Sequence, residues 1–190
     1  MLIGLISDTH VTSKRGKLSE KIFDKFDGVD LILHAGDITT QDVLDELSRI
    51  APVIAVLGNN DKLDLNKLEI IEIKDKKILL AHGNGIDDLY EFGLKYDADI
   101  VVSGHTHRPN YEIINDVILI NPGSSNRPIK SDASVALLRI DEKVAVEFID
   151  LSNKIVSWRI IILPILLISQ QWHLPRTVLL LQARHMTLWV

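Results

Sequence analysis

The chain has 190 residues, with 21 Lys and Arg against 26 Asp and Glu, a formal net charge of −5 and no Cys. This length supports one domain with its own core, and the lack of Cys excludes a disulfide scaffold, a thiolate zinc site and a cysteine nucleophile. The acidic balance argues against a non-specific nucleic-acid binder, which needs a basic face.

From Met1 to Ser103, short apolar runs alternate with amphipathic stretches. The runs are rich in Ile, Leu and Val and predict strands buried on both faces, at Leu2–Ser7, Asp30–His34, Val53–Leu57, Lys77–Ala81 and Asp99–Ser103. The spacing of apolar residues between them predicts helices at Leu18–Phe26, Thr40–Ile50 and Asp87–Lys95. Thr39 or Thr40 is a suitable N-cap for the second helix. This alternation favours α/β layering.

After Arg108 the pattern becomes rich in β-strands. Two hairpins are predicted, one pairing Glu112–Asn115 with Val117–Ile120 and one pairing Ala133–Ile140 with Val144–Asp150.

The C-terminal segment differs in composition from the rest of the chain. All 26 acidic residues precede residue 155 and all three Trp follow it, so we expect a main domain at 1–152 and an apolar extension at 153–190. Its longest apolar run, Ile160–Ile168, is far shorter than the ~20 residues that span a bilayer, and no membrane span is expected. Two interpretations stay open for the extension: a contact surface of a homo-oligomer, or sequence that is not native to the protein.

The first residues, Met-Leu-Ile-Gly-Leu-Ile-Ser-Asp, contain no basic segment and reach an acid at once. They do not form a signal peptide, and a cytoplasmic protein is expected.

Residues that can bind metal follow each of the five predicted strands before Arg108. They are Asp8 and His10, Gly36-Asp37, Gly58-Asn59-Asn60-Asp61, His82-Gly83 and Gly104-His105-Thr106-His107. Each piece alone is compatible with an ordinary turn or surface residue. Their repetition after every strand predicts a metal site, because loops at the strand ends of a layered sheet gather ligands.

Two neighbouring residues receive other interpretations. His34 ends a buried run and is interpreted as a core histidine bonded to the backbone. Asp61 is expected to support its loop or a nearby His rather than bind metal directly.

The ordered set of these motifs resembles the calcineurin-like metallophosphoesterase superfamily. Asn121-Pro122-Gly123-Ser124 also resembles a loop of its small single-domain prokaryotic phosphodiesterase branch. The resemblance implies an α/β (α+β) fold, a four-layer α-β-β-α sandwich with two mixed sheets and a dinuclear metal site at the strand ends. It also implies that one divalent ion is held by Asp8, His10 and His107, that a second is held by Asn59, His82 and His105, and that Asp37 bridges the two.

These ligand types suit hydrolysis of a small phosphodiester. Imidazole and oxygen without sulfur favour Mn, Ni, Fe, Co or Zn over Ca. Two such ions activate a bridging hydroxide and bind the phosphoryl oxygens. We therefore predict a metal-dependent phosphodiesterase in which this hydroxide attacks in line, with the catalytic residues Asp37, Asn59, Asn60 and His105. The alternative is a non-catalytic protein-interaction module on the same scaffold.

Asn60 departs from the family pattern. Many superfamily members carry a His here that is proposed to assist the leaving group, whereas Asn donates a hydrogen bond but no proton at neutral pH. Either a preference for esters with good leaving groups or an acid supplied by water or by the substrate is therefore expected. Asn60, Arg108 and Arg127 are candidate substrate contacts, although surface placement is an equal alternative for the two arginines. Specific nucleic-acid binding is not expected.

Overall fold

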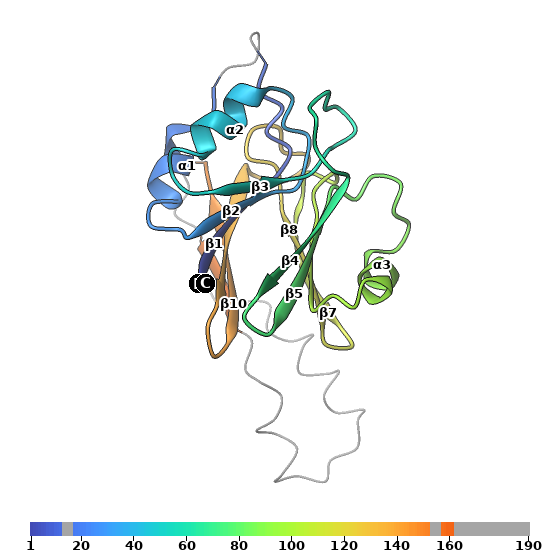
Figure 1. The fold of residues 1–190 in the computed structure, drawn as a ribbon. Helices are drawn as coiled ribbons and strands as arrows, with labels where there is room; N and C mark the ends of the chain where they lie inside the picture. The colour runs from blue at the N-terminus through green and yellow to red at the C-terminus, as the bar shows by residue number, and fades with distance from the viewer. Residues whose placement is uncertain (13–16, 153–156, 162–190) are drawn as a thin grey trace, which may run out of the picture.

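The computed structural model describes residues 1–12, 17–152 and 157–161, and these form two packed sheets with three helices (Figure 1). The six-stranded sheet has the spatial order β11 (Ser157–Ile161), β10 (Val144–Asp150), β9 (Ser134–Ile140), β1 (Leu2–Ile6), β2 (Leu31–His34) and β3 (Val53–Ala55). The five-stranded sheet has the order β4 (Leu68–Ile73), β5 (Lys76–Ala81), β6 (Ile100–Val102), β8 (Val117–Pro122) and β7 (Pro109–Ile114). The helices are α1 (Glu20–Lys25), α2 (Gln41–Leu47) and α3 (Leu89–Lys95).

Both sheets are mixed. Strands β1, β2 and β3 pair in parallel, whereas β9 and β10 join that sheet antiparallel. Strands β5, β6 and β8 are parallel, with β4 and β7 antiparallel at the two edges. Because the parallel strands of each sheet end at a common edge, the loops that follow them gather there.

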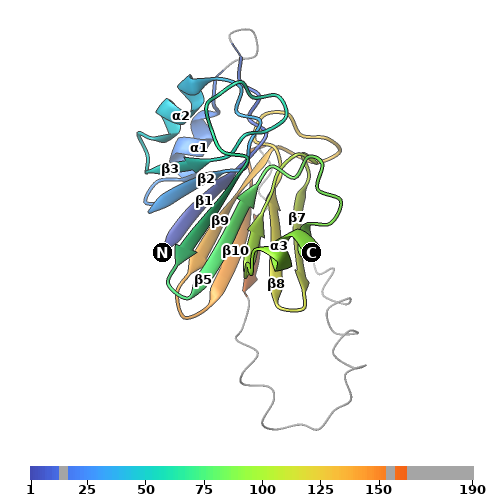
Figure 2. The same cartoon turned by 45° about the vertical axis from the view of Figure 1, so that its right-hand side comes forward.

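Three apolar clusters separate four layers. Between the sheets, alternate residues such as Leu5 of β1 and Leu80 of β5 form the central core. The other face of the six-stranded sheet packs under α1 and α2 through residues such as Ile32. The other face of the five-stranded sheet packs under α3 through Leu79 and Val101. Figure 2 shows the sheets face to face with helices outside, which confirms the predicted four-layer sandwich.

Several elements differ from the predicted ones. The sequence analysis did not predict β4, whose edge position leaves Ile70 45% exposed. Nor did it predict β11, which lies inside the expected extension and pairs antiparallel with β10. The remaining residues of that extension, 153–156 and 162–190, lie outside the described residues. Within the described ranges no helix is long and apolar enough to cross a membrane.

His34, at the end of β2, is completely buried. Its Nε2 lies 3.2 Å from the Thr9 hydroxyl rather than against the backbone, and its Nδ1 has no hydrogen-bond partner. The interpretation of His34 as a core histidine holds, but its hydrogen-bond partner is the Thr9 side chain and not a backbone group. Burial, with a smaller contribution from the charge of His82, lowers the pKa of His34 to about 3.

The buried His34 predicts a loss of stability in mild acid. The unfolded chain binds a proton at this residue below pH ~6.5 and the folded chain does not until about pH 3, so stability falls as the pH decreases between these values. Between pH 7.5 and 5.0 this amounts to about 2 kcal/mol. Urea unfolding at both pH values should show this loss in the wild type and a loss about 2 kcal/mol smaller in His34→Gln. An identical pH dependence of the free energy of unfolding in the two proteins would contradict the assignment of this loss to His34.

Candidate metal centre

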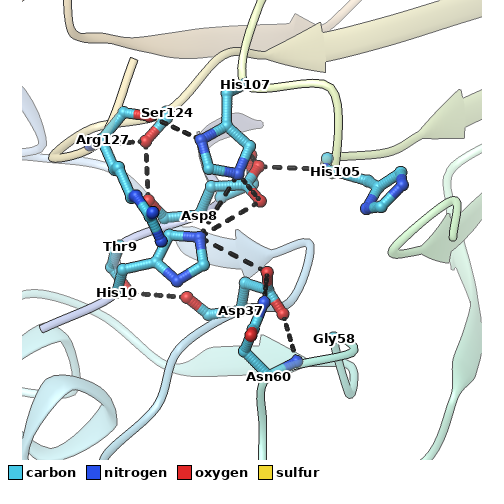
Figure 3. Close-up of polar contacts among 12 residues, drawn as sticks. Asp8, Thr9, His10, Asp37, Gly58, Asn60, His105, His107, Ser124 and Arg127 are labelled. Atoms are coloured by element: carbon cyan, nitrogen blue, oxygen red, sulfur yellow. Dashed lines mark hydrogen bonds and ion pairs between the residues drawn. The ribbon is translucent and has the colours of Figure 1, made fainter. Parts of the chain in front are cut away.

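The loops after β1, β2, β3, β5 and β6 bring the predicted ligands to one edge of the sandwich (Figure 3). Asp8, His10 and Asp37 follow strands of one sheet, and His82 and His107 follow strands of the other. All five are buried. Carboxylates and imidazoles withdrawn from water need mutual pairing or a cation.

Asp8, His10, Asp37 and His107 form one group, whose ligand atoms all lie within 4.8 Å of one another. His10 Nε2 and His107 Nε2 are 3.3 Å apart, and Asp8 Oδ1 is 3.3 Å from His107 Nε2. Asp8 Oδ1 is buried without any hydrogen-bond partner. A divalent cation fits these donors because it would satisfy the orphaned oxygen and the converging nitrogens together.

Backbone carbonyls fix the orientation of two of the imidazoles. His82 Nδ1 lies 2.7 Å from the Ala35 carbonyl oxygen, and His107 Nδ1 lies 2.5 Å from that of Arg127. A carbonyl only accepts, so each Nδ1 carries the proton and donates it. The Nε2 lone pair of each neutral ring is thereby presented to the centre, as is usual for metal-binding histidines.

A second group lies on the other side of Asp37. Asn59 Oδ1 is 3.1 Å from His82 Nε2 and 3.1 Å from His105 Nδ1. Asp37 Oδ1 is 3.6 Å from His82 Nε2, while its Oδ2 is 3.4 Å from His10 Nε2. The two oxygens of one carboxylate therefore face the two groups, and Asp37 links the buried group of four with Asn59, His82 and His105.

Asn60 holds the Asp37 carboxylate from the outside. Its backbone N–H donates to Oδ1 at 2.8 Å and its side-chain amide donates to Oδ2 at 2.6 Å. Burial alone would raise the pKa of Asp37, but these two hydrogen bonds, with the charges of His82 and His10, leave that pKa below its ordinary value. Asp37 is thus held as an anion. At the neighbouring Asp8, burial dominates and raises the pKa.

The backbone at the centre is strained. Five of the seven ligand residues, Asp8, His10, Asp37, His105 and His107, have φ between 46° and 68°. Residues with a side chain rarely adopt this left-handed region, and such strain persists only where surrounding contacts enforce it.

Two glycines allow the loops to approach closely. A Cβ on Gly58 would overlap the backbone nitrogen of Asp37, and one on Gly104 would lie 2.9 Å from Asp8 Oδ2. A larger residue at either position would therefore displace the carboxylate of Asp37 or of Asp8. Gly58 and Gly104 leave room for the Asp37 and Asp8 carboxylates beside the predicted ligand motifs.

Asp61 supports its loop, as expected. Its carboxylate accepts from the backbone N–H of Thr39 at 2.7 Å and of Gly58 at 2.8 Å. The sequence analysis did not single out Ser7, whose hydroxyl lies 2.7 Å from Asp8 Oδ2. Ser124, which belongs to the Asn121-Pro122-Gly123-Ser124 motif, donates to the Asp8 carbonyl at 2.7 Å. For Ser7, its position directly before Asp8 was the available signal.

The two arginines differ in placement. The guanidinium of Arg108 donates through Nε to the carbonyl of Ile129 at 3.3 Å, away from the clustered ligands. The side chain of Arg127 extends toward His10, and its charge helps burial to lower the pKa of that histidine (Figure 3). Arg127 is therefore the better placed of the two for an anionic substrate.

Comparisons with known proteins agree with this geometry. The model of the calcineurin-like phosphoesterase superfamily domain matches residues 1–143. A probable metallophosphoesterase of Methanothermobacter thermautotrophicus is 42% identical over 158 residues, covering 78% of this chain and 92% of that protein. A phosphodiesterase of Methanocaldococcus jannaschii is 32% identical over 160 residues, covering 75% of this chain and 95% of that protein.

Among solved structures, Vps29 of Entamoeba histolytica complexed with Zn²⁺ is similar with a TM-score of 0.76 and 25% identity, over 85% of this chain and 99% of that chain. The family model and the archaeal relatives together cover the whole candidate centre. The chain belongs to the calcineurin-like phosphoesterase superfamily, as a small metallophosphoesterase.

Proposed function

We propose that the protein is a phosphodiesterase that uses two divalent ions, drawn from Mn, Ni, Fe, Co or Zn, to hydrolyse a small phosphodiester. The observation that carries this proposal is the Asp37 carboxylate, with Oδ2 3.4 Å from His10 and Oδ1 3.6 Å from His82. Asp8, His10 and His107 would hold one ion, and Asn59, His82 and His105 the other. All these residues lie within the proposed domain at 1–152, and the cytoplasm stays the expected location.

When bound, two divalent ions would supply an activated water and positive charge for the phosphoryl oxygens. The chain itself supplies orientation. Asn60 fixes the bridging carboxylate, and the carbonyls of Ala35 and Arg127 fix the rings of His82 and His107. The guanidinium of Arg127, which extends toward His10, would contact a phosphoryl oxygen. Asn60 has no proton to deliver to the leaving group, which favours esters of acidic alcohols.

The second candidate function is a protein-interaction module, which the likeness to Vps29 favours. The complete donor set and the relative named as a phosphodiesterase support the enzyme instead. Hydrolysis of bis-p-nitrophenyl phosphate by protein loaded with Mn²⁺ or Ni²⁺ is the deciding assay. Metal-loaded protein that binds a partner but gives no turnover would overturn the proposed activity.

Asp37→Ala should abolish tight metal binding and hydrolysis together, because it removes the carboxylate whose two oxygens face the two groups. Metal content after gel filtration and the rate of bis-p-nitrophenyl phosphate hydrolysis measure the two effects. Asp24→Ala is the matched control, since Asp24 is exposed on α1, and it should retain both. Activity retained in Asp37→Ala would remove Asp37 from the bridging role.

Asn60→Ala should lower metal affinity about 10- to 100-fold, the usual effect of losing a partner of a metal ligand. Asn66→Ala is the matched control and should leave affinity unchanged, because the Asn66 amide donates to Glu69 at 2.8 Å rather than to a predicted metal ligand. At saturating metal, Asn60→Ala should slow the hydrolysis of aryl and alkyl esters by the same factor. A larger decrease in rate for alkyl esters would instead indicate that Asn60 assists departure of the leaving group.

A further inference from the structure

Next to the candidate metal centre, a groove runs along the outer face of the five-stranded sheet. Its volume is about 610 Å³, inside the range of about 300–1,000 Å³ usual for small-molecule sites. It lies between the loop that leads into α3 and strands β7 and β8, and His105 and Thr106 line one end. We call this cavity the outer-sheet groove.

Apolar side chains form much of the outer-sheet groove. Leu89, Ile114 and Leu119 line it and belong to the cluster under α3. Ile86, Pro109 and Ile120 add to the apolar lining. Side chains alternate along a strand, and beyond the first residue of β7 the lining takes Asn110, Glu112 and Ile114. Ile114 therefore faces the groove, and its neighbour Ile113 faces the opposite side of the strand.

The charged residues of the groove are mostly acidic. Asp87, Asp88 and Glu112 line it together with a single arginine, Arg108. Asp88 is held in place as the N-cap of α3, accepting from two backbone N–H groups. These carboxylates would repel a second phosphate, which excludes a polynucleotide or polyphosphate chain running along the groove.

His105 joins the groove to the candidate centre. Its Nδ1 lies 3.1 Å from Asn59 Oδ1, and the same residue lines the groove. A phosphoester bound at the centre would thus carry one of its ester groups beside the groove entrance. The apolar lining suits an organic ring, and the acidic lining disfavours further anionic groups.

We propose that the outer-sheet groove binds a flat, uncharged ring carried by one ester group of the substrate, such as an aryl group or a nucleobase. This assignment rests on the proposed function, because the phosphoryl group at the metal centre anchors the ring. Ile114 is accordingly a residue that determines specificity.

The test measures binding rather than turnover. Titration calorimetry compares phenylphosphonate with methylphosphonate on Mn²⁺-loaded protein, since the two share the phosphonate and differ in the ring. Phenylphosphonate should bind at least about tenfold more tightly, as burial of a ring predicts. Equal affinities, or tighter binding of 2-aminoethylphosphonate than of phenylphosphonate, would overturn the assignment of the groove to an uncharged ring.

Variants of β7 test whether the preference for phenylphosphonate arises in the outer-sheet groove. Ile114→Trp fills the groove and should weaken phenylphosphonate binding about tenfold while leaving methylphosphonate unchanged. Ile113→Trp, the same change on the other face of the strand, should alter neither. Ile114→Ala, which adds no bulk, should reduce the preference about threefold and covers the case in which Ile114→Trp does not fold. A preference that stays undiminished in Ile114→Ala and in every folded Ile114 variant would overturn the proposal.

The outcomes also separate the two proposals. Hydrolysis of bis-p-nitrophenyl phosphate without a ring preference would overturn the groove assignment alone. A ring preference without hydrolysis would overturn the phosphodiesterase and support the groove as a binding site. Binding of neither phosphonate, together with no hydrolysis of bis-p-nitrophenyl phosphate, would overturn both.

Discussion

The structure depends on a group of buried anionic and imidazole donors that cannot satisfy one another. Asp8 Oδ1 has no hydrogen-bond partner, and the Nε2 atoms of His10 and His107 face each other at 3.3 Å. In the folded protein alone, the cost of this arrangement is visible as the raised pKa of Asp8 and the lowered pKa of His10, both dominated by burial. A cation reverses that cost, since it stabilises the carboxylate and the neutral rings at once.

The backbone around these donors is organised to keep them fixed. The predicted ligand residues with positive φ are held by contacts from outside the centre, such as the Ser124 hydroxyl on the Asp8 carbonyl at 2.7 Å. Asn60 has the same effect on Asp37, and Asp61 ties the loop of Asn60 to Thr39. Rigid placement of this kind is what a metal centre requires, because small displacements of a ligand change coordination geometry.

Much of this arrangement could be predicted from the sequence, because it depends on chain order. A ligand residue after every buried strand must reach a shared edge once the strands are parallel, and that reasoning located Asp8, Asp37 and His82. Side-chain direction could not be predicted in the same way. Nothing in the sequence shows that the Asn60 amide turns to Asp37, or that His34 contacts Thr9. Strand β4 was missed because, as an edge strand, it is not a continuously buried run.

The division of the ligands between the sheets has a mechanical consequence. Asp8, His10, Asp37 and Asn59 follow strands of the six-stranded sheet, whereas His82, His105 and His107 follow strands of the five-stranded sheet. Each ion would therefore be coordinated from both halves of the sandwich and act as a cross-link between them. Removal of metal by a chelator would break this cross-link between the two sheets. The melting temperature of the protein should therefore decrease, independently of any effect on hydrolysis.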